Sequence, residues 1–232
     1  MQSISARVDS DGYAVLPDWL EPHWCERLIA GLDERGRQAP EDKRLMPHQP
    51  FLDLLVEPAI LDLVTSVLGP DPLFHHANGK RITDGAGKPW HHDFDSVTPW
   101  DGDPASVMLH VMIYPAGLTP ENGPLVLRPR THRMRVPRHH PNALGYQVEA
   151  DDVTLTAGPG TVVLVHSALW HMRPPSHVTE PRYYLNFSFI GNAPVTRPER
   201  EGYSDLLASM PDAVPDQRCR DRLTALCRGH RF

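Results

Sequence analysis

Two histidine-bearing segments constrain the fold of this chain more than any other feature. The run KPWHHDF holds His91 and Asp93, and the run VVLVHSALWHMR holds His166 and, 78 residues beyond Asp93, His171. Residues two apart in an extended strand point to the same side, so His91 and Asp93 can face one point together. One imidazole from the second run would complete a three-residue cluster. The fold must therefore bring two strands that are far apart in sequence to the same place.

Two histidines and one carboxylate on one face of a metal ion are the ligand set of non-haem Fe(II) oxygenases, which leaves the opposite positions open. The residues alone leave two candidates for the third ligand, His166 and His171. Eleven residues after His171 stands Arg182, at the start of the strand-like run RYYLNFSF. A guanidinium forms paired hydrogen bonds with a carboxylate, as an enzyme that uses 2-oxoglutarate requires for the remote carboxylate of this acid.

These motifs resemble the phytanoyl-CoA dioxygenase family of Fe(II)/2-oxoglutarate oxygenases. The resemblance runs from about Asp11 to Ile190 and includes DGYAVLPDWL, PWHHD, ENGPLVLRPRTHR and GTVVLVHSALWH. It implies that His91, Asp93 and His171 bind Fe(II), that Arg182 binds 2-oxoglutarate and that O₂ is consumed. His166 matches a position that is often histidine in the family without being the ligand.

The chain departs from the family pattern at three places. Arg173 stands where relatives usually have a small hydroxyl residue, PPSHVTEP replaces an Asn-x-Ser pattern, and a Pro-Gly-Ser/Thr-His turn reads Pro129-Arg130-Thr131-His132. The first change removes a hydroxyl contact to 2-oxoglutarate, or places a second cation beside it or beside an anionic substrate.

The remaining histidines and a basic segment have less specific interpretations. No ligand spacing distinguishes the other histidines, for which a hydrogen-bonded or solvent-facing role is favoured: His75, His76, His110, His132, His139, His140 and His177. The basic segment from Arg128 to His140 is expected to be a solvated loop. Its alternative role is a lid that attracts an anionic substrate.

Composition excludes several classes of protein. With 232 residues, of which 40% are hydrophobic, the chain is long enough for one domain with a sizeable core. A net charge of −6 with interspersed signs argues against nucleic-acid binding. No apolar run is long enough to span a membrane, and the first residues do not form a signal peptide. Three cysteines do not make a disulfide framework, so we expect a cytoplasmic protein.

The order of the predicted elements is helices first and strands later. A strand is expected at Gly12–Leu16, a helix from Glu21 to Gly36, and a second helical region within Phe51–Leu68. Short apolar runs between glycines and prolines then predict the core strands, which are Leu73–Ile82, Val107–Tyr114, Leu125–Leu127, Thr161–Val165 and Tyr183–Ile190. A last helix is expected at about Pro215–Arg228.

This order fits a mainly β fold with flanking helices, and the resemblance implies a double-stranded β-helix (a cupin-like jelly roll). We expect a single domain over residues 1–232. A helical brace lies within 1–70, the jelly-roll core occupies about 71–192, and a helical tail spans 193–232.

The expected activity is hydroxylation of an unactivated C–H bond of a small molecule, with no oligomeric state assigned. A composition rich in arginine, proline and alanine is typical of GC-rich actinobacteria and suggests specialised metabolism. Two alternatives are a metal-dependent jelly-roll enzyme that does not use 2-oxoglutarate, and a non-catalytic binding module with the same fold.

Overall fold

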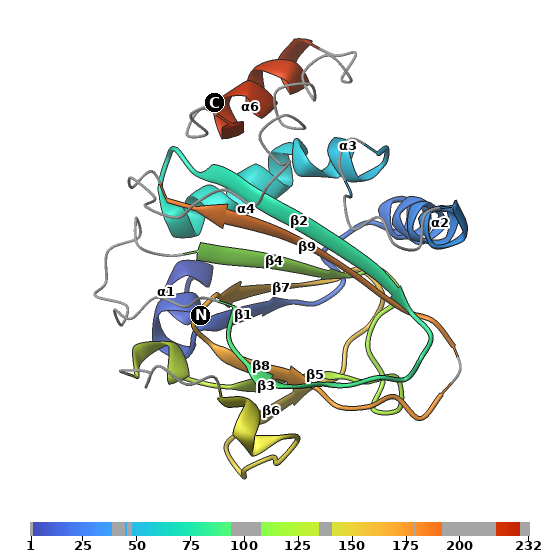
Figure 1. Cartoon of the computed structure of the whole chain (residues 1–232). Coiled ribbons are helices and arrows are strands. Elements are labelled where there is room, and N and C mark those ends of the chain that lie inside the picture. The colour runs from blue at the N-terminus through green and yellow to red at the C-terminus, as the bar shows by residue number, and fades with distance from the viewer. Residues whose placement is uncertain are drawn as a thin grey trace.

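The computed structural model of the chain describes residues 2–38, 45, 48–93, 108–134, 141–178, 180–191 and 217–227. Two antiparallel sheets face each other (Figure 1). The five-stranded sheet has the order β1 (Tyr13–Leu16), β7 (Thr161–His166), β4 (Met108–Tyr114), β9 (Arg182–Ile190) and β2 (Leu73–Ile82). The four-stranded sheet has the order β3 (Lys88–His91), β8 (Trp170–Arg173), β5 (Leu125–Arg128) and β6 (Val153–Leu155). This arrangement confirms the predicted jelly-roll class.

Helices cover the outer face of the five-stranded sheet (Figure 1). They are α1 (Ile4–Asp11), α2 (Pro22–Gln38), α3 (Phe51–Leu55), α4 (Pro58–Leu68) and, on the same side, α6 (Gln217–Cys227). The sequence predicted one helical region within Phe51–Leu68, and the structure has two helices there. The helical conformation is disfavoured for the residue before Pro58, so the chain turns at that point. No described helix has the length and apolar character needed to cross a bilayer.

Strand β4 shows how the core is divided into two layers. All seven of its residues are buried, because side chains alternate between two covered faces. Leu109, Val111 and Ile113 pack with the helices, whereas Met112 and Tyr114 face the space between the two sheets. An unbroken apolar run therefore marks a strand that is covered on both sides.

The strands that carry the candidate site are short and were harder to foresee. The sequence did not predict three of the observed elements, namely α1, β6 and β8. It did predict β2, with the observed bounds. Strands β3 and β8 pair antiparallel with His91 opposite His171. This pairing joins two segments that are distant in sequence at one end of the four-stranded sheet.

Candidate metal centre

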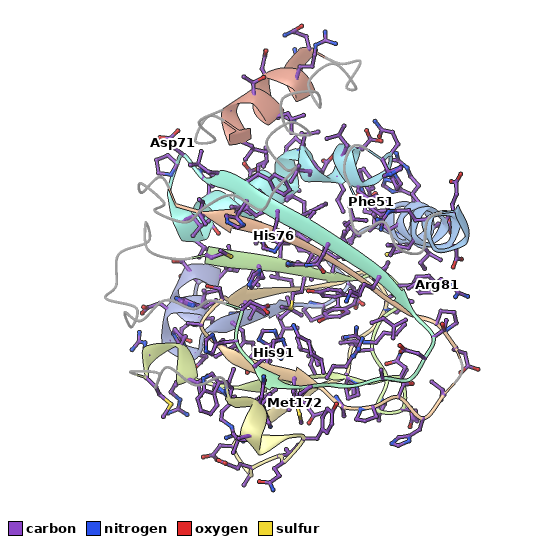
Figure 2. All side chains as sticks on the ribbon, in the orientation of Figure 1. Phe51, Asp71, His76, Arg81, His91 and Met172 are labelled. Carbon is purple, nitrogen blue, oxygen red and sulfur yellow. The ribbon has the colours of Figure 1, made fainter. Side chains whose placement is uncertain are left out.

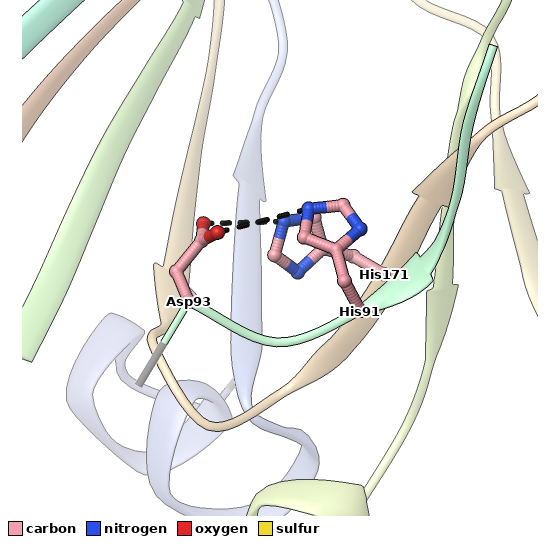
Figure 3. Close-up of side chains that lie close together, drawn as sticks. All are labelled: His91, Asp93 and His171. Carbon is pink, nitrogen blue, oxygen red and sulfur yellow. Dashed lines mark ion pairs between the residues drawn. The ribbon is translucent and has the colours of Figure 1, made fainter. Parts of the chain in front are cut away.

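His91, Asp93 and His171 converge on one point (Figure 3). His171 Nε2 lies 3.4 Å from Asp93 Oδ2, and His91 Nε2 lies 3.7 Å from Asp93 Oδ1. One ligand atom from each residue lies within 4.8 Å of the other two, and among the described residues this group of His, Cys, Asp and Glu side chains is the one that could hold a metal ion. The distal histidine at this point is His171.

The backbone places Asp93 differently from the sequence expectation. Strand β3 ends at His91, and Asp93 lies in a bend two residues later rather than in a continuing strand. The amide of Asp93 donates to the carbonyl of Ser167 at 3.0 Å, which ties this bend to the turn between β7 and β8. The Asp93 carboxylate therefore reaches the two imidazoles from the bend that follows β3.

Each of the two imidazoles is oriented by a carbonyl on its own strand. His91 Nδ1 lies 2.7 Å from the Pro89 oxygen, and His171 Nδ1 lies 2.9 Å from the Leu169 oxygen. A carbonyl only accepts, so each Nδ1 carries the hydrogen and each Nε2 offers a lone pair toward Asp93. This arrangement is the usual support of histidine ligands to metals. His91 Nε2 is buried and makes no hydrogen bond among the described residues, so its lone pair fits a metal ligand.

Burial and charge keep His91 and Asp93 in the protonation states that a metal needs. Burial, followed by the neighbouring His171 and Lys88, lowers the pKa of His91 to about 2. For Asp93, burial acts to raise the pKa, but the nearby histidines outweigh it and hold the pKa of this carboxyl well below its usual range. The residues present therefore fit a divalent cation, since an uncharged His91 and an ionised Asp93 are ligating forms.

His166, the other candidate for the distal ligand, supports a turn. Its Nδ1 accepts a hydrogen bond from the amide of Ala168 at 3.0 Å, and its ring lies 5.1 Å from that of His132. Burial lowers the pKa of His166 to about 3. The structure brings His171 to Asp93 and leaves His166 at the end of β7.

Arg182 lies inside the jelly roll on β9. Its side chain is buried, its Nε donates to the carbonyl of Gly123 at 2.9 Å, and its guanidinium lies over the rings of Tyr114 and Tyr184. No carboxylate of a described residue lies within 4.0 Å of it. Its charge is therefore available to an anionic ligand.

Arg173 is a neighbour of Arg182. Burial and then the charge of Arg182 lower the pKa of Arg173, its Nη2 donates to the carbonyl of Ala86, and its Nε has no partner among the described residues. Gly123 packs closely against this segment: an added Cβ would lie 3.0 Å from the Pro174 carbonyl oxygen and 3.3 Å from Arg173 Cγ, and the φ of 77° also favours glycine. Two cations thus occupy one end of the space between the sheets.

Two members of the triad formed by His91, Asp93 and His171, namely His91 and Asp93, line a small pocket. The pocket has a volume of about 290 Å³ and is lined by Lys88, Pro89, His91, His92, Asp93 and Asn142. The Asp93 side chain is 31% exposed, so the carboxylate faces this opening whereas the two imidazoles are buried.

The basic segment is partly explained by ion pairs. Arg128 lies between the rings of Trp90 and Trp170 and forms two hydrogen bonds with Asp152. Arg133 pairs with Asp9 of α1 on the surface. Among the described part of the segment, these two arginines are structural. Four other basic residues of the segment lie outside the described residues, namely Arg135, Arg138, His139 and His140.

His110 is the residue that sequence reasoning set aside and the structure brings to the site. It is 1% exposed on β4, and its Nε2 lies 3.6 Å from Asp93 Oδ2. Burial, which outweighs the opposing charge of Asp93, lowers the pKa of His110 to about 4, so its ring is neutral at neutral pH. No local signal marks it, because its position beside Asp93 depends on strand neighbours.

Comparison with known proteins agrees with this geometry. The family model of phytanoyl-CoA dioxygenase matches residues 8–182. The chain is 29% identical to the ectoine dioxygenase of Halomonas elongata over 56% of its own length, and 29% identical to the L-proline trans-4-hydroxylase of Streptomyces griseoviridis over 59%. These alignments span 45% and 62% of the two relatives, less than two thirds of either.

A solved structure shares the fold at lower identity. The epimerase SnoN, in complex with Fe³⁺, alpha ketoglutarate and nogalamycin RO, superposes with a TM-score of 0.67 at 15% identity and covers 81% of this chain and 82% of its own.

Proposed function

The chain belongs to the phytanoyl-CoA dioxygenase family, and on that premise we propose that it is an Fe(II)/2-oxoglutarate-dependent hydroxylase of a small molecule. The observation that carries the proposal is the convergence of His91, Asp93 and His171, with Nδ1 of both imidazoles bonded to a carbonyl and Nε2 turned toward Asp93. The two curated relatives are named for ectoine and L-proline, both small molecules.

In this proposal Fe(II) is held by His91 and His171 through Nε2 and by the Asp93 carboxylate. Iron with 2-oxoglutarate and O₂ supplies the oxidation that converts a C–H bond to C–OH, with succinate and CO₂ as coproducts. The presence of a carboxylate at position 93 favours hydroxylation, since halogenating relatives have a small residue there.

Arg182 is proposed to bind the remote carboxylate of 2-oxoglutarate. It is a buried cation without a carboxylate partner among the described residues, and a guanidinium binds a carboxylate through two parallel hydrogen bonds. Tyr114 and Tyr184 lie against this guanidinium and shield it from water, which strengthens the pairing. Arg173 adds a second positive charge beside it.

The substrate is proposed to be a small molecule of specialised metabolism that enters through the pocket beside Asp93. That pocket, at about 290 Å³, lies just below the range of roughly 300–1,000 Å³ that is usual for small-molecule sites. Its surface is mainly apolar, and Lys88 and Asp93 are the charged residues of its lining.

The test is consumption of 2-oxoglutarate under controlled iron and O₂. Fe(II)-loaded protein is incubated with 2-oxoglutarate and a library of amino acids, small phosphonates, acyl thioesters and polycyclic compounds, and succinate is measured together with a product mass increase of one oxygen. Asp93→Ala is the inactive control. Turnover of a substrate without succinate would support a metal enzyme that does not use 2-oxoglutarate, and absence of Fe(II) binding would support a binding module.

A further inference from the structure

A row of buried polar side chains crosses the five-stranded sheet beside the candidate metal centre. His76, Ser188 and His110 are direct cross-strand partners on β2, β9 and β4, so they lie on one face of the sheet. Figure 2 shows His76 on this sheet and His91 on the facing one. The three side chains of the row are buried, with exposures of 9%, 0% and 1%.

The row forms a continuous line of contacts that ends at Asp93. His76 Nε2 lies 3.2 Å from Ser188 Oγ, Ser188 Oγ lies 2.8 Å from His110 Nδ1, and His110 Nε2 lies 3.6 Å from Asp93 Oδ2. Asn186 Nδ2 donates to Ser188 Oγ at 2.9 Å and lies 3.4 Å from His110 Nδ1. His110 Nε2 has no hydrogen-bond partner among the described residues, and Asp93 is the carboxylate that it faces.

Only two arrangements of hydrogens satisfy these contacts. Ser188 has one hydroxyl hydrogen, and its oxygen already accepts from Asn186. In the first arrangement the Ser188 hydroxyl donates to His110 Nδ1, so that the neutral ring carries its hydrogen on Nε2. In the second, His110 Nδ1 donates to Ser188, and Nε2 presents a lone pair.

The electrostatics of the buried site select the first arrangement. A lone pair on His110 Nε2 would face the negative charge of Asp93 at 3.6 Å in a region of low dielectric, where such repulsion is costly. With the hydrogen on Nε2, the same contact becomes attractive. The Asn186 amide near His110 Nδ1 agrees, since it also requires Nδ1 to accept. At 3.6 Å the contact is slightly long for a hydrogen bond, and a shift of about 0.5 Å would complete one.

We propose that His110 is a positioning residue for Asp93, whose carboxylate is held toward the two imidazoles by the Nε2 hydrogen that Ser188 and Asn186 orient. The inference rests on the proposed function, because it assumes that Asp93 binds the metal. In this role His110, which is not itself a ligand, restricts rotation of Asp93, the most exposed of the three ligands. Such outer supports typically contribute 10- to 100-fold to metal affinity.

The test measures metal binding to the metal-free protein, independently of turnover. Co(II) is titrated in competition with a chromophoric chelator, and the visible absorption spectrum of the Co(II) complex reports the coordination geometry. His110→Leu should raise the Kd about 10- to 100-fold and alter the spectrum. His110→Gln, which can place an N–H near the position of Nε2, should restore most of the affinity. Ser188→Ala should raise the Kd by less than His110→Leu, since the ring remains but loses its main orienting donor.

The matched control is His132→Gln, because His132 is equally buried but contacts the Asp9 carbonyl instead of the triad. It should leave the Kd and the spectrum unchanged even if the protein is less stable. The proposal is overturned if His110→Leu binds Co(II) like wild type, or if His110→Gln is as damaging as His110→Leu. Should His110→Leu fail to fold, an unchanged Kd and spectrum in Ser188→Ala would overturn it. A wild-type protein that binds no Co(II) would instead count against the proposed function.

Discussion

His91 and His171 lie directly opposite each other on β3 and β8, and each ring donates from Nδ1 to the carbonyl two residues before it. The two strands therefore present both Nε2 atoms to Asp93, and the rings, tilted by 56° to each other, have centroids 4.1 Å apart. The histidine pair is set by local backbone on both strands, whereas Asp93 comes from the bend that follows β3.

The distal ligand can be tested by comparing the two histidines of the second segment. His171→Ala should abolish stoichiometric Fe(II) or Co(II) binding, because it removes one of three ligands, and should leave the far-ultraviolet circular dichroism spectrum close to wild type. His166→Asn keeps an acceptor for the Ala168 amide and should bind metal normally. The reverse pattern would show that His166 is the ligand.

The role of Arg182 can be tested by cosubstrate binding. Arg182→Ala should weaken 2-oxoglutarate binding to the Ni(II)-loaded protein by about 2–5 kcal/mol, or roughly 30- to several-thousand-fold, because two charge-assisted bonds are lost. Arg182→Lys should recover part of the affinity, since an ammonium cannot form the paired bonds. Isothermal titration calorimetry measures both. Unchanged binding in Arg182→Ala would move the role to Arg173.

The ion pairs that Arg128 and Arg133 form should differ in their contribution to stability. Arg128→Met removes the cation that pairs with the Asp152 carboxylate, whose side chain is 1% exposed and which then keeps the hydrogen bond from the Glu149 amide, and should lower the free energy of unfolding by about 3–5 kcal/mol. Arg133→Met removes a half-exposed pair with Asp9 and should change it by about 0–1 kcal/mol. Urea denaturation of the metal-free variants measures the difference, and equal losses would contradict the assignment.

Buried His166 predicts a loss of stability in acid. Its pKa is about 3 in the folded protein and near 6.5 in the unfolded chain, so between these values the unfolded state binds the additional proton. The free energy of unfolding should therefore fall as the pH falls from 6.5 toward 3, by about 1.4 kcal/mol per pH unit from this group. His166→Asn should have a pH dependence that is shallower by that amount. Parallel curves for the two proteins would show that folding does not lower the pKa of His166.

Several elements could be predicted because their burial leaves a local pattern. Leu73–Ile82 was predicted at the bounds of β2, and Met108–Tyr114 is recognisable as a run covered on both faces. Helix α2 has a proline at its start and apolar residues at helical spacing. Short strands of four residues or fewer, such as β8 and β6, carry too few side chains to show a period.

The candidate ligands divide in the same way. His91 and Asp93 are two residues apart, and this spacing indicates a metal site. The family resemblance added His171 and Arg182 to that site. The sequence could not say how Asp93 reaches the imidazoles, because that depends on the bend after β3 and on its hydrogen bond to Ser167.

The sequence by itself determined the fold class and the residue types of the candidate site, because both follow from residue types and short spacings. Only the tertiary structure decided the roles of the remaining histidines. His166 supports a turn and His110 faces Asp93, although both lie in apolar runs that look alike. The physical reason is that a histidine's role depends on its neighbours across the sheet, and in a jelly roll the strands that become neighbours are far apart in the chain.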